Sequence, residues 1–113
     1  MKDTIFQQKQ LAQSRPSGTS AASIYNPARN AMMETVAVAN TTGSAAALSI
    51  YHDVDGTTYD QTTALFYSVS LAANSTYLIQ FEHPIPIPAD SNIAVQTDTG
   101  NALTFTIYGE ERI

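Results

Sequence analysis

The chain has 113 residues, 43% of them hydrophobic, which is enough for one domain with a thin core and too much for a disordered chain. It carries a net charge of −5 and no cysteine, which argues against a nucleic-acid partner and excludes a disulfide framework, a thiolate metal site and a cysteine nucleophile. No apolar run approaches the ~20 residues of a membrane-spanning helix, and the first ten residues lack the apolar region of a secretory signal, so we expect neither.

Charges are few and unevenly distributed along the chain. Only 13% of the residues are charged, about half the usual ~25%, and roughly a fifth are Ser or Thr. Four of the five Lys and Arg residues lie in the first 29 positions, and none occurs between Asn30 and Glu111. A neutral, hydroxyl-rich surface favours close contact with other proteins, because few ions must be desolvated.

Composition divides the chain into an N-terminal arm, residues 1–23, and a body, residues 24–113. The arm is rich in Gln, Ser, Ala and Thr, and we expect it to be extended and ordered by a neighbouring molecule. A weak helix over Thr4–Ser14 is the alternative, ended by Pro16 and Gly18. The residues of the arm that could contact a partner are three basic and three apolar ones: Lys2, Lys9 and Arg15, with Ile5, Phe6 and Leu11.

From Ile24 onward, short apolar runs alternate with turn-forming residues every ~8–12 positions, which predicts strands. No credible helix lies among them. The predicted strands are Ser23–Tyr25, Glu34–Asn40, Ala46–Asp53, Ala64–Leu71, Thr76–Glu82, Ser91–Thr97 and Ala102–Gly109.

Alternation of apolar and polar residues is clear in three of these strands. Leu65, Tyr67, Val69 and Leu71 are expected on one face of the fourth strand, and Phe66, Ser68 and Ser70 on the other. The same rhythm puts Tyr77, Ile79 and Phe81 on one face, and Leu103, Phe105 and Ile107 on one face of the last strand. Strands of this number and length predict an all-β fold, an antiparallel two-sheet sandwich with jelly-roll or Greek-key topology; a mostly closed barrel is the alternative.

The acidic segment from His52 to Asp60 is the one cluster of functional groups. Its spacing departs from a calcium-binding loop, since Gly56 directly follows the second aspartate and no glutamate closes the segment. We interpret it as a hairpin tip in which Asp55-Gly56 forms a tight turn with positive φ and the acids cap backbone amides. A weak cation site is the alternative; we expect no metal and no cofactor.

Catalytic patterns are not evident. His52 is expected at a strand end, partly covered, and no strained Gly-x-Ser-x-Gly turn presents a serine to a histidine. His83 opens a segment with prolines at 84, 86 and 88, which holds the chain extended. Its two isoleucines, Ile85 and Ile87, either seat in a partner or, as we favour, pack into the domain's own core. We therefore predict no enzyme activity and no small-molecule substrate.

Three segments carry a resemblance to a known group of proteins: IYNPA (24–28), ETVAVANTTGSAAALSIYHDVDGTTYDQTTALFYSVSLAANST (34–76) and IAVQTDTGNALTFTIYGEE (93–111). Together they resemble small bacteriophage virion domains, such as capsid decoration (cement) proteins and tail-associated modules. The resemblance covers about three-quarters of the chain, leaves residues 1–23 outside, and involves no catalytic position.

The resemblance implies a phage structural protein that decorates the capsid surface and stabilises the shell. Its expected partners are the major capsid protein and sister copies, as a homotrimer, and its expected place of synthesis is the cytoplasm of the bacterial host. Alternatives are a tail or neck component of the virion, a small β-sandwich hydrolase, and a carbohydrate-binding module with an aromatic trough built from Tyr51, Tyr59, Tyr67 or Tyr77.

Overall fold

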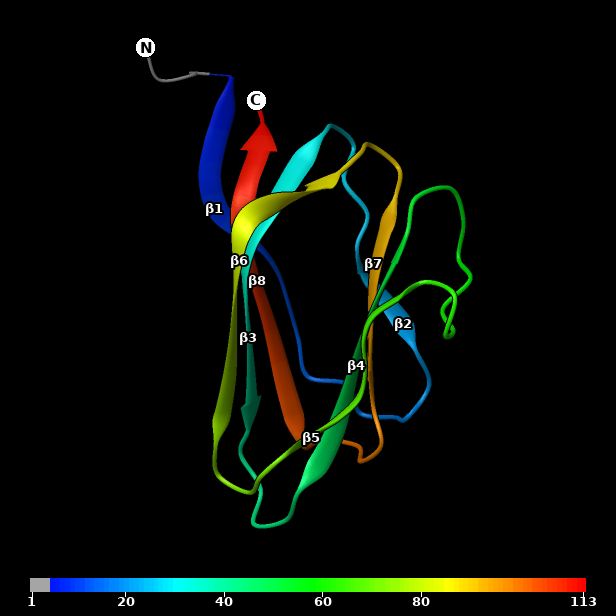
Figure 1. Ribbon diagram of the computed structural model, residues 1–113, viewed down its shortest axis with the longest axis vertical. Helices are drawn as coiled ribbons and strands as arrows, with labels where there is room; N and C mark the ends of the chain where they lie inside the picture. The colour runs from blue at the N-terminus through cyan, green and yellow to red at the C-terminus, as the bar shows by residue number, and fades with distance from the viewer. Residues whose placement is uncertain (1–4) are drawn as a thin grey trace.

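The computed structural model describes residues 5–113, which form two four-stranded antiparallel sheets packed face to face (Figure 1). Among these residues no helix is long and apolar enough to cross a membrane. The strands are β1 (Phe6–Ser14), β2 (Ala22–Tyr25), β3 (Ala31–Asn40), β4 (Ala46–Asp53), β5 (Ala64–Leu71), β6 (Thr76–Ile87), β7 (Asn92–Thr97) and β8 (Leu103–Arg112).

The order of the strands identifies the topology. The first sheet has the order β1-β8-β3-β6 and the second has the order β2-β7-β4-β5. Every connection except that between β4 and β5 therefore crosses from one sheet to the other. Eight strands connected in this way form a jelly roll, which confirms the predicted fold class.

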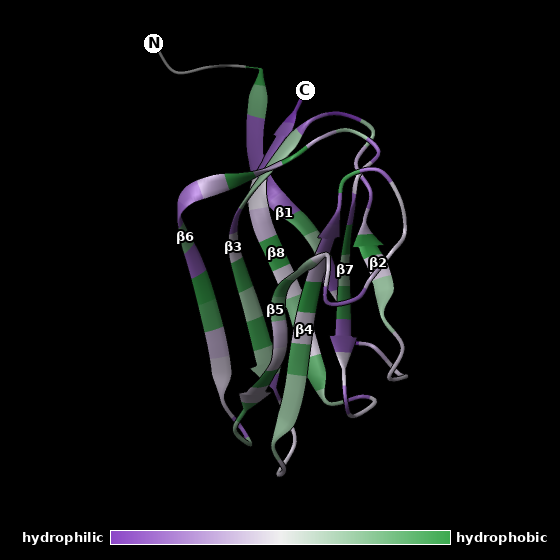
Figure 2. Cartoon of the chain, turned by 45° about the vertical axis from the view of Figure 1, so that its right-hand side comes forward, coloured by the Kyte–Doolittle hydropathy of each residue, from purple (hydrophilic) through white to green (hydrophobic). Residues whose placement is uncertain are grey.

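The core lies between the sheets and follows the predicted alternation (Figure 2). Leu103, Phe105 and Ile107 of β8 are fully buried, as are Val36 and Val38 of β3. They meet the inward residues of the second sheet, because each strand presents every second side chain to the opposite layer. The fully buried residues among them are Leu48, Ile50, Ile93 and Val95.

Residues 6–14 of the predicted arm form β1, the edge strand of the first sheet. β1 pairs with β8 from Phe6↔Arg112 to Ser14↔Phe105, so the alternative of a helix in this segment is wrong. Its polar backbone finds its hydrogen-bond partners in β8, and Leu11 and Ala12 pack against the core. The segment is extended, as predicted, and it is part of a sheet of its own domain; the predicted boundary at residue 23 falls inside β2.

A β-bulge interrupts the alternation of β5. Leu48 pairs with Val69 but Ile50 pairs with Phe66, so β5 has one residue more than β4 across this step. Phe66 and Val69 both pack against the core, whereas Tyr67 is 51% exposed. The prediction that Tyr67 shares a face with Val69 is therefore wrong, because the extra residue shifts the pattern by one position.

The pairing register of the first sheet shifts at neighbouring positions in all of its strand pairs. Leu11 is the extra residue of β1 opposite β8, and Glu34 is the extra residue of β3 opposite β8. On the far side of β3, four residues of β6 (81–84) lie opposite the single residue Glu34, since Met33 pairs with Ile85 and the next pair is Thr35 with Gln80. Beyond this level β6 bends over the end of the sandwich (Figure 1). We call this line of irregularities the crease.

Gly109 of β8 lies at the crease, where it pairs with Met33 of β3. A Cβ atom at this position would overlap the carbonyl oxygen of Met32 and would lie 3.0 Å from Leu11 Cδ1. The carbonyl belongs to a paired strand and has no freedom to withdraw, so only glycine fits.

The proline-rich segment continues β6 as far as Ile87. Ile87 is fully buried and Ile85 packs against the core, which confirms that both isoleucines belong to the domain's own interior. Turn-forming residues connect several of the strands. Asn74, Asp90 and Asn101 adopt φ of 56°, 67° and 58°, the left-handed region that Asn and Asp tolerate best.

Candidate functional site

The residues predicted to contact a partner through the arm lie in or beside β1. Ile5 is 41% exposed, and Phe6 and Leu11 are half-buried; Lys2 falls outside the described residues. The backbone N–H of Ile113 donates to the carbonyl of Ile5 (2.7 Å), which ties the start of β1 to the end of β8. Ile113 is itself 66% exposed, so two isoleucines stand exposed at the end of the domain where both termini lie (Figure 1).

Lys9 is already paired within the domain. Its ammonium lies 3.2 Å from Glu111 Oε1, while the Tyr25 hydroxyl donates to Glu111 Oε2 (2.6 Å). The hydrogen bond from Tyr25, assisted by Lys9, lowers the pKa of Glu111 below its usual value despite partial burial. Because Tyr25 is on β2 while Lys9 and Glu111 are on β1 and β8, this network joins the two sheets. The Lys9 pair is solvent-exposed and therefore contributes at most about 1 kcal/mol.

Arg15 fixes the segment that connects β1 to β2. Its guanidinium donates to the hydroxyls of Thr41 (2.8 Å) and Thr104 (3.2 Å) and to the carbonyl of Asn101 (2.6 Å). Five donors in a rigid planar group suit this task, which a lysine could not perform. Arg15 is therefore engaged with its own domain.

The acidic segment forms a closed loop between β4 and β5. Asp53 accepts hydrogen bonds from the backbone amides of Asp55 (3.2 Å) and Thr58 (2.8 Å), and the Thr58 bond lowers the pKa of Asp53. Asp60 likewise accepts from the amide of Thr62 (2.8 Å). The acids cap backbone amides as predicted, but the proposed positive φ at Gly56 is wrong, since no glycine among residues 5–113 has one. Within the same residues, no three His, Asp or Glu side chains lie together as metal ligands would.

His52 and Tyr59 each have a buried polar atom that makes no hydrogen bond to the described residues. These atoms, His52 Nε2 and the Tyr59 hydroxyl oxygen, are buried without a hydrogen-bond partner among residues 5–113. Burial lowers the pKa of His52, with Asp53 opposing the shift, which favours neutral imidazole at neutral pH. Neither His52 nor His83 hydrogen-bonds a serine in the described part of the chain, so the arrangement required for a serine nucleophile is not assembled there.

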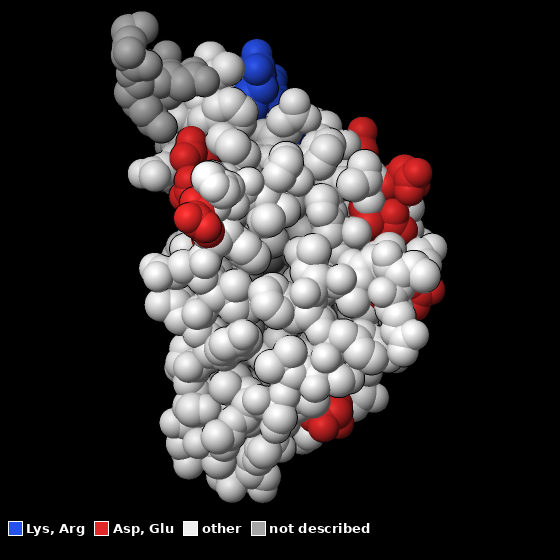
Figure 3. All heavy atoms as spheres, in the orientation of Figure 1, with Lys and Arg blue, Asp and Glu red and all other residues white. Residues whose placement is uncertain are grey.

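β5 and β6, the edge strands on one side of the sandwich, carry no charge over a long stretch. Residues 61–81 contain no Asp, Glu, Lys or Arg. Leu65 and Leu78 are 40% and 55% exposed on either side of this edge, and the Phe66 ring packs against Tyr77 and Phe81 where the two sheets meet. Figure 3 shows the uncharged surface over the lower part of β6, with the charged groups elsewhere on that face. We call residues 61–81 the neutral edge.

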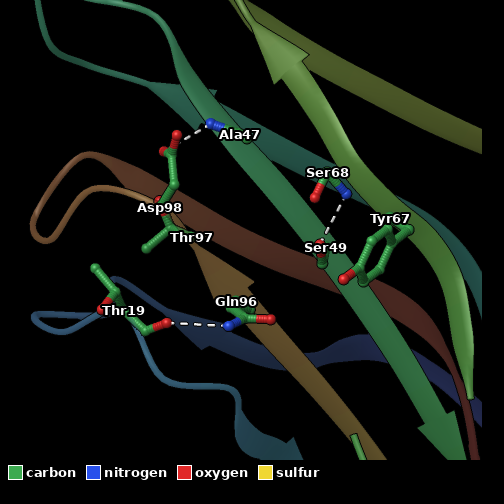
Figure 4. A pocket seen from close by; sticks show the side chains of 8 residues that line it. All are labelled: Thr19, Ala47, Ser49, Tyr67, Ser68, Gln96, Thr97 and Asp98. Atoms are coloured by element: carbon green, nitrogen blue, oxygen red, sulfur yellow. Dashed lines mark hydrogen bonds between the residues drawn. The ribbon is translucent and has the colours of Figure 1, made fainter. Parts of the chain in front are cut away.

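A polar pocket of about 160 Å³ opens on the outer face of the second sheet (Figure 4). Ser49 of β4 forms its floor, with Tyr67 and Ser68 of β5 on one side. The opposite side is formed by Gln96 of β7, by Asp98, which follows β7, and by Thr19, which precedes β2. The complete lining is Thr19, Ala47, Ser49, Tyr67, Ser68, Gln96, Thr97 and Asp98.

The lining side chains are held by hydrogen bonds within the domain. Ser49 Oγ accepts from the backbone N–H of Ser68 (2.9 Å). Gln96 donates through Nε2 to the carbonyl of Thr19 (3.1 Å) and accepts through Oε1 from the Tyr51 hydroxyl (2.5 Å). Asp98 Oδ1 accepts from the N–H of Ala47 (2.8 Å). The pocket therefore has fixed polar walls.

Sequence reasoning did not find this pocket. Of the four tyrosines considered for an aromatic trough, Tyr51 is 1% exposed and packs on Tyr59 (ring centroids 6.3 Å apart), and Tyr77 lies at the neutral edge. Only Tyr67 lines the pocket. The predicted trough is therefore not assembled. The sequence could have predicted that Ser49 faces outward, because it alternates with the buried Ile50. It could not have predicted the position of Ser68, because no local sequence pattern marks the β5 bulge.

Comparison with known proteins identifies the fold. No family model and no curated protein matches the chain. Two solved structures that it resembles come from infectious bursal disease virus. A chain of the T13 viral particle has 12% identity and a TM-score of 0.51 over 96% of this chain. The VP2 subviral particle has 15% identity and a TM-score of 0.50 over 93% of this chain.

This chain spans about a third of the length of those viral chains, 36% and 31% respectively. At such low identity the likeness shows a shared fold: one jelly-roll domain corresponds to one part of a larger viral particle protein. The comparison agrees with the topology read from the strand order.

Proposed function

We propose that this protein is a non-enzymatic structural component of a virion, and more specifically a decoration protein on the outer surface of a bacteriophage capsid. The observation that carries the proposal is a jelly-roll domain with an uncharged, partly apolar edge. The likeness to viral particle chains and the resemblance of residues 24–28, 34–76 and 93–111 to phage virion domains support the same class.

The neutral edge is suited to contact with sister copies. Exposed edge strands invite pairing with other chains, and proteins that remain monomeric usually carry charge or proline there. The distal half of β6 is protected in this way by Pro84 and Pro86, which lack a backbone donor. Residues 64–80 have no such protection and contain the exposed Leu65 and Leu78. A homotrimer that buries this edge desolvates no ion.

The end of the domain with both termini is suited to the shell. Ile5 and Ile113 are exposed side by side, and the Arg29 guanidinium donates to the carbonyl of Ile113 (2.8 Å). A fully buried isoleucine contributes roughly 1.5–3 kcal/mol, whereas an exposed ion pair contributes about 0–1 kcal/mol and weakens in salt. Apolar contacts of Ile5 and Phe6 with the major capsid protein therefore hold the subunit, and Lys2 and Lys9 add orientation.

Reconstitution tests the contact at the neutral edge. Particles stripped of the protein are mixed with wild-type protein or with Leu78→Asp, and occupancy is measured by gel densitometry. Leu78→Asp should be a monomer with reduced occupancy. Val54→Asp is the matched control, because Val54 is an equally exposed apolar residue (54%) in the β4–β5 loop; it should bind as wild type does.

Three results would contradict the proposal. Equal occupancy of Leu78→Asp and wild type would show that the neutral edge takes no part in assembly. Equal rupture temperatures of stripped and decorated particles would show that the protein does not stabilise the shell. A copy number per virion far below that of the shell subunit assigns the protein to the tail or neck.

A further inference from the structure

Three side chains that line the pocket on the second sheet have hydrogen-bonding capacity that no described residue uses, and a fourth adds an exposed aromatic face. Ser49 Oγ accepts one hydrogen bond and keeps its own proton to donate. The Ser68 hydroxyl and Asp98 Oδ2 have no hydrogen-bond partner among the described residues. Tyr67 extends from β5 across the floor with half of its surface exposed (Figure 4).

Backbone strain is concentrated at the same place. Ser68 has φ = 51°, a left-handed conformation that serine rarely adopts, in the middle of a strand. The bulge there turns the Ser68 N–H onto Ser49 and directs Tyr67 outward over the pocket. Ser68 and Tyr67 belong to the same irregular step, so the strain positions lining groups of the pocket. Strained residues and bulges of this kind cluster at binding sites.

Charge and size define the ligand class. Asp98 is the only charged residue in the lining, and no Lys or Arg contributes to it, so an anion is disfavoured. A volume of about 160 Å³ in a pocket that is open to solvent limits the ligand to a small molecule, of the size of a single six-membered ring. An aromatic face beside hydroxyl, amide and carboxylate groups complements a molecule with an apolar C–H face and a rim of hydroxyls.

We propose that this pocket binds a single neutral sugar ring, with the C–H face of the ring on Tyr67 and its hydroxyls hydrogen-bonded to Ser49, Ser68 and Asp98. Gln96, clamped by Tyr51 and Thr19, forms the opposite wall. The inference does not depend on the virion role, because it rests on the pocket alone. On an assembled particle this site would give the protein an affinity for glycans in addition to its shell contacts.

Titration followed by nuclear magnetic resonance tests the proposal on the wild-type chain. ¹⁵N-labelled protein is titrated separately with the methyl glycosides of glucose, galactose, mannose and N-acetylglucosamine. At least one should produce saturable shifts of the Ser68 amide and the Gln96 side-chain amide, with a Kd in the millimolar range that a single small ring can reach. Sorbitol, an open-chain polyol, and the anionic sugar N-acetylneuraminic acid should produce weaker, non-saturating shifts.

Variants then locate the site. Tyr67→Ala should weaken binding at least tenfold, while Tyr77→Ala, which removes another exposed tyrosine at the neutral edge, should leave the Kd unchanged. Wild-type protein that shows no saturable shift with any of the four glycosides overturns the proposal. So do equal shifts with sorbitol, or a Tyr67→Ala protein that is folded by its amide spectrum and binds as wild type does.

Discussion

Gly109 provides the sharpest test of the described packing. Gly109→Ala adds one methyl group that overlaps the Met32 carbonyl oxygen, and relief requires β3 and β8 to separate by roughly an ångström or more. Overpacking of this kind costs about 1–3 kcal/mol, and two weakened ladder hydrogen bonds add about 1 kcal/mol each. The expected destabilisation is therefore about 3–5 kcal/mol. At about 4 °C per kcal/mol for a domain of this size, Tm should fall by about 12–20 °C.

The assay is thermal unfolding followed by far-ultraviolet circular dichroism, with Gly43→Ala as the matched control. A Cβ at Gly43 meets nothing within 4 Å and the residue has no positive φ, so Tm should change by less than about 2 °C. If Gly109→Ala melts within about 2 °C of Gly43→Ala, the close approach of β3 and β8 at the crease is wrong.

Three further predictions concern the ends, the loop and pH. Deleting residues 1–14 removes β1 and uncovers β8, so the shortened chain should melt well below the full chain; an unchanged Tm would show that this segment is dispensable, as a separate arm would be. Chelator should leave Tm within error, because the acids of the β4–β5 loop bind backbone amides; a drop restored by Ca²⁺ would reassign them as ligands. The pKa of Glu111 is lower in the folded protein than the ordinary value of 4.5. Its carboxylate therefore stabilises the fold fully above pH 4.5, and this contribution is lost as the pH falls through the lower pKa of the folded state. Tm of the wild type should therefore fall more steeply than that of Glu111→Gln below pH 4.5, and parallel curves would contradict the Tyr25–Glu111 bond.

The bounds of β4 and β5 could be predicted because their signals are local. Ala46–Asp53 and Ala64–Leu71 were predicted with the bounds that the structure has, since each is an apolar run between turn-forming residues. β1 could not be predicted in this way. Its sequence, FQQKQLAQS, has no apolar alternation, and it is a strand because β8 supplies its hydrogen-bond partners from the other end of the chain.

The candidate pocket was beyond sequence reasoning for a related reason. It depends on the φ of Ser68 and on the segment containing Thr19 lying across the second sheet. That segment is held by Gln96, which donates to the carbonyl of Thr19, and at its start by Arg15, which was predicted to face a partner. A local pattern cannot reveal that a basic residue in a polar segment is already occupied by three groups of its own domain.

The pairing of β1 with β8 also determines the order in which the domain can be completed. Residues 6–14 leave the ribosome long before residues 103–112 exist, so the first strand must wait unpaired while the others assemble. Closing a segment of this length costs about 4 kcal/mol in chain entropy, which makes the step late and reversible. A waiting strand rich in valine and isoleucine would invite aggregation, whereas one made of Gln, Lys and Ser stays soluble until its partner arrives. The weak strand signal of this segment thus suits a strand that pairs last.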